Sequence, residues 1–252
     1  MQMIRNSFVL LDKVGLKKEQ SIWNQGVLEW NDFLSTNNIK GISKNNKEKF
    51  NDKIIQAKKE LFKENSEYFA NEIPFSEQWR LYNEFKDQAL FLDIETNGYY
   101  GSITVIGLFD GFETKTMIRG YNLDKNLLEN ELKKYKLLIT FNGASFDVPV
   151  IKRFFGINIT IPHIDLRFLC QRIGLKGGLK QIEKDLDIKR CKEVQEISGA
   201  DSVYLWNNWQ SLRRREYLDL LIKYNEEDVI NLKPLAEFAV KEMKNQIFKT
   251  KL

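Results

Sequence analysis

Cysteine and histidine are scarce in this chain of 252 residues. Cys170 and Cys191 are the only cysteines, and His163 is the only histidine. The cysteines do not form the CxxC pair that is typical of zinc ligands, and a disulfide framework needs more of them. The composition therefore argues against a structural zinc site and against a fold that depends on disulfides.

Long hydrophobic runs and targeting signals are also missing. No apolar run approaches the roughly 20 residues that span a bilayer. The opening residues MQMIRNSF lack the apolar stretch and the cleavage site of a signal peptide. We therefore expect a cytoplasmic protein that does not bind membranes.

Neither sign of charge is in strong excess. The net charge is +4 at pH 7 and the isoelectric point is near 8.8. This mild basicity permits binding to a polyanion but is too common to indicate it. A hydrophobic content of 42% and an aromatic content of 12% support a packed core. The chain is therefore expected to be globular.

A nucleotide-binding loop is absent as well. The segment GLKGGLKQIEKDL is rich in glycine and lysine but lacks the spacing of a P-loop. We therefore expect no nucleotide cofactor. Lys176 and Lys180 in this segment are candidates for contact with a nucleic-acid backbone, and the alternative is a solvated loop.

Residues 1–86 are predicted to form a helical, polar N-terminal region. Within about 8–34, Gly15 offers a tight turn and Gly26 ends a short helix. This part resembles a degenerate helix-hairpin-helix, a module that grips phosphate backbones through backbone amides. Lys13 stands where the first turn glycine is usual, and a small helical packing module is the alternative.

Two further helices are predicted in the N-terminal region. Apolar residues recur at helical spacing over 53–69 and again over 76–85. Pro74 separates the two patterns.

The pattern changes near Ala89, and we assign residues 87–252 to a second domain. ALFLDIET, SITVIGLFDG and ETKTMIRG predict three strands, NLDKNLLENELKKY a helix, and KLLITFNG another strand. The rest is helical and ends in a long helix from about Leu212 to Asn245. These elements predict an α/β fold with a mixed sheet flanked by helices.

Two acidic residues lie in the first predicted strand. Because side chains alternate across a strand, Asp93 and Glu95 emerge on one face, while Leu92 and Ile94 point to the other. The two carboxylates can then address one ion. Taken alone, this pair also fits a structural ion pair.

A third acidic residue follows the later strand. In KLLITFNGASFDVPVIKRFFG, a strand leads through an Asn-Gly turn into a helix that Gly156 ends. Asp147 stands at the start of this helix, where capping is the alternative role. The same position lies at the carboxyl end of a strand, where open α/β sheets place their ligand sites. Asn142 is expected to help hold the turn and is also a candidate for contact with nucleic acid.

The long C-terminal helix contributes the fourth acid. Its buried stripe is predicted from Leu218, Leu221, Leu232 and Leu235, and Asp228 falls within that stripe. Glu226 and Glu227 lie off it and are expected to be solvated. Tyr224 comes four residues before Asp228, so its hydroxyl projects from about the same face. A core aromatic residue is the alternative for Tyr224.

Four other residues carry a prediction. His163 and Asp165 in IPHIDLRFLC precede a helical pattern, and we expect capping and packing there rather than metal binding. Tyr99 and Tyr100 follow the first acidic motif and are candidates for stacking on a terminal base.

Together, the segments FLDIET, FNGASFD and YNEED resemble the three exonuclease motifs of the DEDD branch of the ribonuclease-H-like superfamily. Tyr224 places the resemblance in the DEDDy group, because the histidine variant would need a histidine near Lys223. The chain is similar to the YprB-type exonuclease-like domain, which shares stretches such as SFVLLDKVGL and WRLYNEFKDQALFLDIET. The resemblance extends over nearly the whole chain.

The resemblance implies a site with two metal ions. Asp93 would bridge the ions, Glu95 and Asp228 would complete one, and Asp147 would reach the other through water. Tyr224 would orient the attacking water. Hard carboxylate ligands suit Mg²⁺ or Mn²⁺.

The function implied is that of a metal-dependent 3′–5′ exonuclease. It would act on the 3′ end of single-stranded DNA or RNA and release nucleoside monophosphates. One alternative is an endonuclease of the same superfamily that cuts a structured substrate. Another is a catalytically silent protein that binds nucleic acid.

Overall fold

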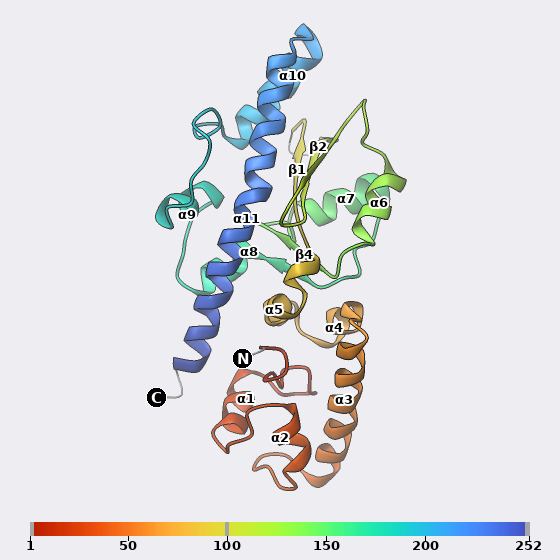
Figure 1. Ribbon diagram of the computed structural model, residues 1–252, viewed down its shortest axis with the longest axis vertical. Coiled ribbons are helices and arrows are strands. Elements are labelled where there is room, and N and C mark those ends of the chain that lie inside the picture. Colours follow the sequence, from red (N-terminus) through yellow and green to blue (C-terminus); the bar gives the residue numbers. More distant parts are fainter. Residues whose placement is uncertain (1–2, 99–100, 250–252) are drawn as a thin grey trace.

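A computed structural model describes residues 3–98 and 101–249 of the chain (Figure 1). Tyr99 and Tyr100, the predicted stacking residues, lie outside the described residues. The longest helix runs along the molecule beside a sheet, and the N-terminal helices gather at one end of that sheet. This arrangement places the predicted acidic motifs in the upper part of the view.

The sheet contains five strands in the order β3-β2-β1-β4-β5. β1 pairs antiparallel with β2 and parallel with β4; β2 and β3 are antiparallel, and β4 and β5 are parallel. The mixed α/β fold predicted from the sequence is confirmed. The strands are β1 (Ala89–Thr96), β2 (Ile103–Phe109), β3 (Thr114–Ile118), β4 (Leu137–Thr140) and β5 (His163–Asp165).

Strand β5 was not predicted. It has three residues, which is too short for an alternating pattern to distinguish it from a loop before a helix. It pairs with β4 at the edge of the sheet. Its position brings His163 and Asp165 to the end of β4, beside the turn that follows that strand.

One face of the sheet is apolar and is covered by α6 (Lys125–Leu132) and α7 (Asp147–Phe155). Leu92 and Ile94 of β1 pack in this layer with Leu128 and Ile151 from the two helices. The alternation predicted for β1 is therefore confirmed on its apolar side. Burial of aliphatic side chains on this scale supplies the main drive for folding.

The opposite face carries the acidic side chains of β1 and is covered chiefly by α11 (Arg215–Lys249). Leu218, Leu221, Leu232 and Leu235 of this helix are all buried, as the stripe predicted. Three shorter helices complete this side of the molecule: α8 (Leu166–Arg172), α9 (Leu179–Asp185) and α10 (Gly199–Leu212).

The N-terminal region is helical, as predicted. The continuous helix expected over 53–69 is wrong, because α3 ends at Phe62 and Glu64 adopts a left-handed φ of 54°. The elements are α1 (Leu16–Trp23), α2 (Trp30–Ser35), α3 (Lys44–Phe62), α4 (Ser66–Glu72), η1 (Phe75–Leu81), α5 (Tyr82–Phe85) and η2 (Lys86–Gln88).

Turns, rather than a helix, precede Gly15 among the described residues. Lys13, which stands at the usual turn glycine, has a left-handed φ of 60°. This backbone conformation favours glycine, which is the usual residue at this position of the motif. The helix-hairpin-helix resemblance stays a prediction.

One hydrophobic cluster joins the N-terminal region to the sheet. It contains Phe8 and Phe85 from the N-terminal region, Phe91 from β1 and Leu235 from α11. The domain boundary at residue 86 stays a prediction, but the apolar core crosses that position.

A buried ion-pair network lies within the N-terminal region. The side chains of Arg80 and Glu19 are both 0% exposed, and the guanidinium bonds the carboxylate at 2.9 Å. Glu19 also accepts the backbone N–H of Phe8 at 2.7 Å, and Arg80 bonds Glu77 at 2.7 Å. The network therefore links the first turns of the chain to η1.

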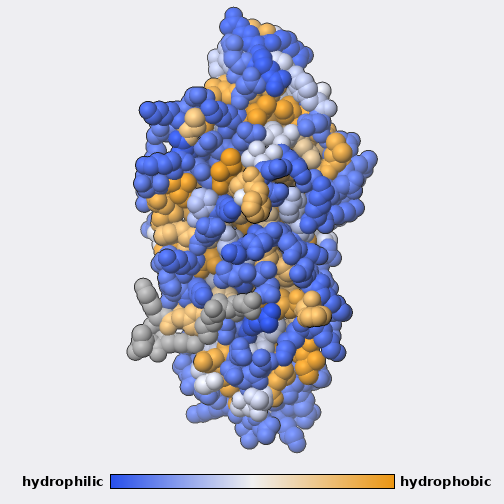
Figure 2. All heavy atoms as spheres, in the orientation of Figure 1, coloured by the Kyte–Doolittle hydropathy of each residue, from blue (hydrophilic) through white to orange (hydrophobic). Residues whose placement is uncertain are grey.

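The visible surface is mainly hydrophilic, with hydrophobic groups scattered over it (Figure 2). Among the described helices, none is both long enough and apolar enough to cross a membrane.

Candidate metal centre

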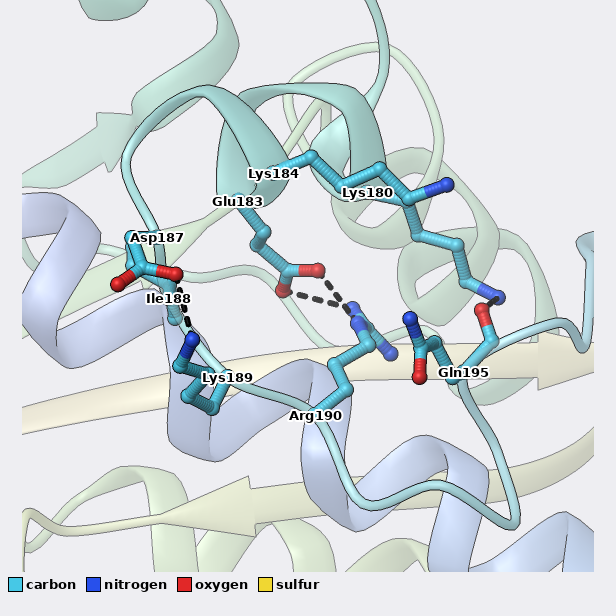
Figure 3. Close-up of a pocket in the computed structure, with 8 residues that line it drawn as sticks. All are labelled: Lys180, Glu183, Lys184, Asp187, Ile188, Lys189, Arg190 and Gln195. Carbon is cyan, nitrogen blue, oxygen red and sulfur yellow. Dashed lines mark hydrogen bonds and ion pairs between the residues drawn. The ribbon is translucent and has the colours of Figure 1, made fainter.

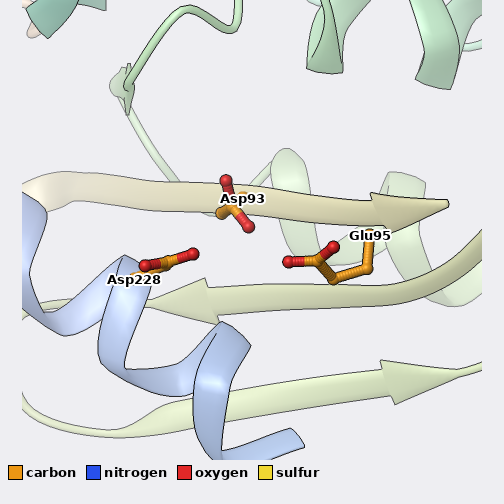
Figure 4. Close-up of side chains that lie close together, drawn as sticks. All are labelled: Asp93, Glu95 and Asp228. Carbon is orange, nitrogen blue, oxygen red and sulfur yellow. The ribbon is translucent and has the colours of Figure 1, made fainter. Parts of the chain in front are cut away.

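Three carboxylates converge between β1 and α11. Asp93 and Glu95 on β1 and Asp228 on α11 each offer an oxygen, and these atoms lie within 4.8 Å of one another. Figure 4 shows the three side chains turned toward a common point. Three residues from two elements far apart in the sequence therefore form one cluster of oxygen ligands.

Asp147, the fourth predicted acid, lies outside that group of three. Its Oδ1 accepts the backbone N–H of Ile94 at 3.0 Å. The pairing of β1 with β4 ends at Phe91 and Ile139. The Ile94 N–H lies beyond the last β1 residue that pairs with β4, and the Asp147 carboxylate accepts it. Asp147 thereby fixes the start of α7 against β1, next to the three acids.

All four acids and Tyr224 line one cavity of ≈ 230 Å³. Glu95, Asp147 and Asp228 are only 8%, 2% and 6% exposed. Asn142 also lines this cavity, which we call the acid cavity. The sequence therefore predicted residues from three separate motifs that the fold brings to one place.

Burial makes these carboxylates hard to ionise. It raises the pKa of Asp93 well above its usual range, and the charges of Asp147 and Asp228 add to the effect. Burial likewise raises the pKa of Glu95 to about 8 and that of Asp147 to about 7. Like charges held together in a low dielectric resist deprotonation. A bound cation would relieve this cost.

Tyr224 is 7% exposed and stands one turn before Asp228. Burial raises its pKa strongly, and the nearby charges of Asp228 and Glu95 raise it further. The phenol therefore keeps its proton at physiological pH, and its O–H is available as a hydrogen-bond donor in the acid cavity.

Asn225 is a site residue that the sequence analysis missed. Its amide donates to Oδ2 of Asp93 at 2.8 Å and fixes the orientation of that carboxylate. An added Cβ on Gly107, which pairs with Asp93 across the sheet, would lie 2.2 Å from Oδ1 of Asn225. Glycine at this position lets α11 approach the strand. The sequence does contain a sign of this role, because Asn225 is a polar residue in the apolar stripe of α11, between Leu221 and Asp228.

Arg190 was also missed. Its guanidinium pairs with the carboxylates of both Glu183 and Asp228, and its side chain is 4% exposed. The pairing opposes the effect of burial, which raises the pKa of Asp228. Arg190 lies in a segment without periodic pattern, so the sequence offered no signal for it.

Ser202 is a further missed residue, from α10. Its hydroxyl donates to the backbone carbonyl of Gly199 at 2.8 Å and lies close enough to Glu95 to oppose the rise in the pKa of that carboxyl. Gly199 and Val203 of the same helix also line the acid cavity. The start of α10 therefore forms one wall of the site.

The turn after β4 is held by Asp165. Its two carboxylate oxygens accept the backbone N–H groups of Asn142 at 2.8 Å and Ala144 at 3.0 Å. Its Oδ1 also accepts the N–H of Arg167, which caps α8 as predicted. Asn142 has a left-handed φ of 66°, and its side chain accepts from Arg167 at 2.7 Å. Asp165 therefore shapes the acid cavity from outside it.

His163 is a packing residue, as expected. Burial lowers its pKa to about 4, so the imidazole is neutral. Its Nε2 lies 2.8 Å from the hydroxyl of Thr140, and its ring packs against Phe75 with centroids 5.6 Å apart.

The two predicted lysines differ in position. Lys180 places its ammonium 5.1 Å from the ring centroid of Tyr224, next to the acid cavity. Lys176 is exposed and is not among the described residues that line this cavity.

The donor set fits a hard divalent cation. It consists of carboxylate oxygens, and no cysteine or histidine belongs to the cluster of described residues. Oxygen ligands of this kind suit Mg²⁺ or Mn²⁺. Burial and the neighbouring carboxylates raise the pKa of Asp93 and of Glu95, and a divalent cation would favour their ionised forms.

Comparison with known families agrees with this fold. The family model of the RNase H superfamily matches residues 90–240, which is more than half of the chain. The protein belongs to the RNase H superfamily. No curated protein matches the chain.

Two solved structures are similar in part. The family B DNA polymerase from the hyperthermophilic archaeon Pyrobaculum calidifontis has a TM-score of 0.49 and 15% identity, and the match covers 60% of this chain and 24% of that one. RNase D of Escherichia coli, an exoribonuclease involved in structured RNA processing, has a TM-score of 0.47 and 19% identity, with 69% and 44% covered. The match thus spans less than half the length of either protein.

Proposed function

We propose that this protein is a metal-dependent 3′–5′ exonuclease that hydrolyses phosphodiester bonds at the 3′ end of single-stranded DNA or RNA. Two Mg²⁺ or Mn²⁺ ions would be held by Asp93, Glu95, Asp147 and Asp228. The single observation that carries the proposal is the convergence in one cavity of Tyr224 and these four acids, of which three are buried and Asp93 is half-buried. Membership of the RNase H superfamily and the DEDDy resemblance support it.

When bound, the metal ions would supply Lewis-acid chemistry, which would activate water and neutralise charge on a phosphoryl group. The protein's own residues prepare the ligands. Asn225 holds Asp93 through its amide, Arg190 holds Asp228, and the N–H of Ile94 holds Asp147. Partners of this kind fix the orientation of metal ligands and tune their basicity.

Tyr224 acts as a hydrogen-bond donor in the site. Its phenol is surrounded by carboxylates and stays protonated, so it donates a hydrogen bond to the attacking water or to a phosphate oxygen. It positions the reacting groups and does not transfer its own proton. This role is the one expected for the tyrosine of the DEDDy motif.

Digestion of a 5′-labelled oligonucleotide tests the proposal. With Mg²⁺ or Mn²⁺, the wild type is expected to give a ladder of products shortened from the 3′ end, on DNA, RNA or both. EDTA and the Asp93→Asn variant should abolish the ladder. The absence of metal-dependent degradation would refute the proposal.

Two further substrates separate the alternatives. A circular single strand stays intact with an exonuclease and is cut by an endonuclease. A block on the 3′ end stops 3′–5′ digestion and leaves the opposite polarity unaffected. Binding of the strand without any cleavage would indicate a silent, nucleic-acid-binding protein.

A further inference from the structure

A second cavity lies beside the acid cavity. It measures ≈ 230 Å³ and is formed by α9 and the segment 187–195. Figure 3 shows the side chains of Lys180 and Lys184 extending toward the same side, with the guanidinium of Arg190 between Glu183 and Gln195. We call this cavity the basic pocket.

The basic pocket carries an excess of positive charge. Its lining residues contribute four cations, Lys180, Lys184, Lys189 and Arg190, against two acids, Glu183 and Asp187. Lys189 pairs with Asp187 at 2.6 Å, where both side chains are 83% exposed. Two cations therefore have no acidic partner within the pocket itself.

Three donors in the pocket are poorly satisfied. Lys184 has no ion pair among the described residues. Lys180 reaches only two backbone carbonyls, at 3.5 and 3.4 Å, and burial together with the charge of Arg190 lowers its pKa. Nη1 of Arg190 is buried and has no hydrogen-bond partner among the described residues. The whole side chain is only 4% exposed. Of these three donors, only Nη1 of Arg190 is buried, because Lys184 is exposed and Lys180 is half-buried. A buried donor without a partner indicates a missing acceptor.

The basic pocket adjoins the proposed cleavage site through two of its residues. Lys180 lies over the ring of Tyr224, and Arg190 pairs with Asp228. Tyr224 and Asp228 both line the acid cavity. A strand whose 3′ end occupies the acid cavity would therefore have its next phosphates near these cations.

The framework of the pocket is fixed before any ligand binds. Arg190 bonds Glu183 at 2.7 Å, and Asn231 of α11 bonds the same carboxylate at 3.1 Å. The backbone N–H of Cys191 donates to Glu227 at 3.2 Å, so this half-buried glutamate is not simply solvated as the sequence predicted. These bonds attach the segment to α11, so binding would cost little ordering of the backbone.

We infer that the basic pocket binds one backbone phosphate of the nucleic-acid strand, through Lys180, Lys184 and Nη1 of Arg190. The inference rests on the proposed function, because the ligand is the same strand. The cations also serve a second purpose. Positive charge beside the acid cavity draws the polyanionic strand toward the carboxylates.

The double variant Lys180→Gln/Lys184→Gln tests this inference. Binding of a fluorescent single-stranded oligonucleotide is measured by anisotropy in the Asp93→Asn background, at several salt concentrations. We expect Kd to rise about tenfold and the slope of log K against log salt to fall by about 0.7, the value for one lost phosphate contact. In the cleaving enzyme, KM should rise by more than kcat falls.

Matched variants provide the controls. Lys125→Gln/Lys152→Gln removes the same charge from exposed residues of α6 and α7 and should leave the slope unchanged. Lys184→Arg keeps the charge and should retain affinity. Each variant is first checked for an unchanged melting temperature.

The outcomes separate the inference from the proposed function. If the wild type cleaves but the double variant keeps the Kd and the slope, the inference is wrong and the function stands. If the variant loses only inhibition by a nucleoside monophosphate, the pocket binds the product and the backbone assignment is wrong. A wild type that neither binds nor cleaves would overturn both.

Discussion

Ionisation of the carboxylates in the acid cavity lowers the stability of the folded protein, so this stability depends on pH. Between the unfolded pKa of an acid and its raised folded pKa, the folded state binds more protons than the unfolded state. Stability is therefore full below the unfolded pKa and declines as pH rises through the folded pKa. For Glu95 and Asp147 the decline extends to about pH 8 and about pH 7, respectively.

We therefore expect the metal-free protein to melt at a lower temperature at pH 8 than at pH 5.5. Mg²⁺ or Mn²⁺ should restore stability, and the restored amount should grow as pH rises, because the cation competes with protons for the carboxylates. Melting curves in EDTA and in metal check this. The Glu95→Gln variant should show a smaller pH effect, and a melting temperature in EDTA that rises from pH 5.5 to pH 8 would contradict the account.

Residue patterns predicted much of the acid cavity. The alternation in β1 placed Asp93 and Glu95 together, and the stripe of α11 separated Asp228 from Glu226 and Glu227. Arg190 was not predictable, because its place depends on the tertiary packing of an irregular segment against α11. Periodicity reports which face of an element is buried, and it does not report what meets that face.

The packing of α11 against β2 is the element-level feature on which the site depends. Gly107 permits this close approach, since an added Cβ would lie 2.2 Å from Asn225 and 3.1 Å from Val229. Both neighbours belong to the helix that also carries Tyr224 and Asp228. A larger residue at this position would disturb the helix and the amide that holds Asp93.

The Gly107→Ala variant is expected to bind Mn²⁺ about 10–100-fold more weakly, the usual cost of losing a partner that orients a metal ligand. Calorimetric titration measures the affinity. Gly15→Ala is the matched control, because its added Cβ meets nothing within 4 Å. Equal Mn²⁺ affinity in Gly107→Ala and in the wild type would show that the close approach does not matter for the site.

At this scale the sequence predicted four of the five strands and the long helix. β5 was not predicted because three residues are too few to show an alternating pattern. The break between α3 and α4 was not predicted because the apolar residues keep their helical spacing across Glu64. The backbone at Glu64 adopts a left-handed conformation. Glutamate is not a residue type that predicts this conformation.

The whole molecule has an apolar core that crosses the predicted domain boundary. Phe8 and Phe85 share one cluster with Phe91 and Leu235, and Trp23 packs against Phe248 near the end of α11 with ring centroids 5.6 Å apart. The N-terminal region and the sheet therefore depend on each other for burial. We expect them to unfold in one transition.

The Glu19→Gln variant tests this dependence. Removing one partner of a buried ion pair typically costs about 3–5 kcal/mol, and Glu19 is the partner of the fully buried Arg80. The melting temperature of the entire protein should fall, and the metal-stabilised site should unfold in the same transition. Glu72→Gln, which removes a partly exposed partner of Lys53, should cost less than about 1 kcal/mol. A separate, unshifted transition for the sheet would show two independent domains.

We propose above that the four acids hold the metal ions that an exonuclease needs to shorten a nucleic-acid strand from its 3′ end. The most direct measurement is the initial rate of nucleoside monophosphate release from a single-stranded oligonucleotide in Mn²⁺, compared between the wild type and Asp93→Asn. We predict metal-dependent release by the wild type and a loss of more than roughly 100-fold in the variant, since even the partners that orient metal ligands contribute about 10–100-fold. Equal rates in the two proteins, or no release by the wild type on either DNA or RNA, would contradict the claim.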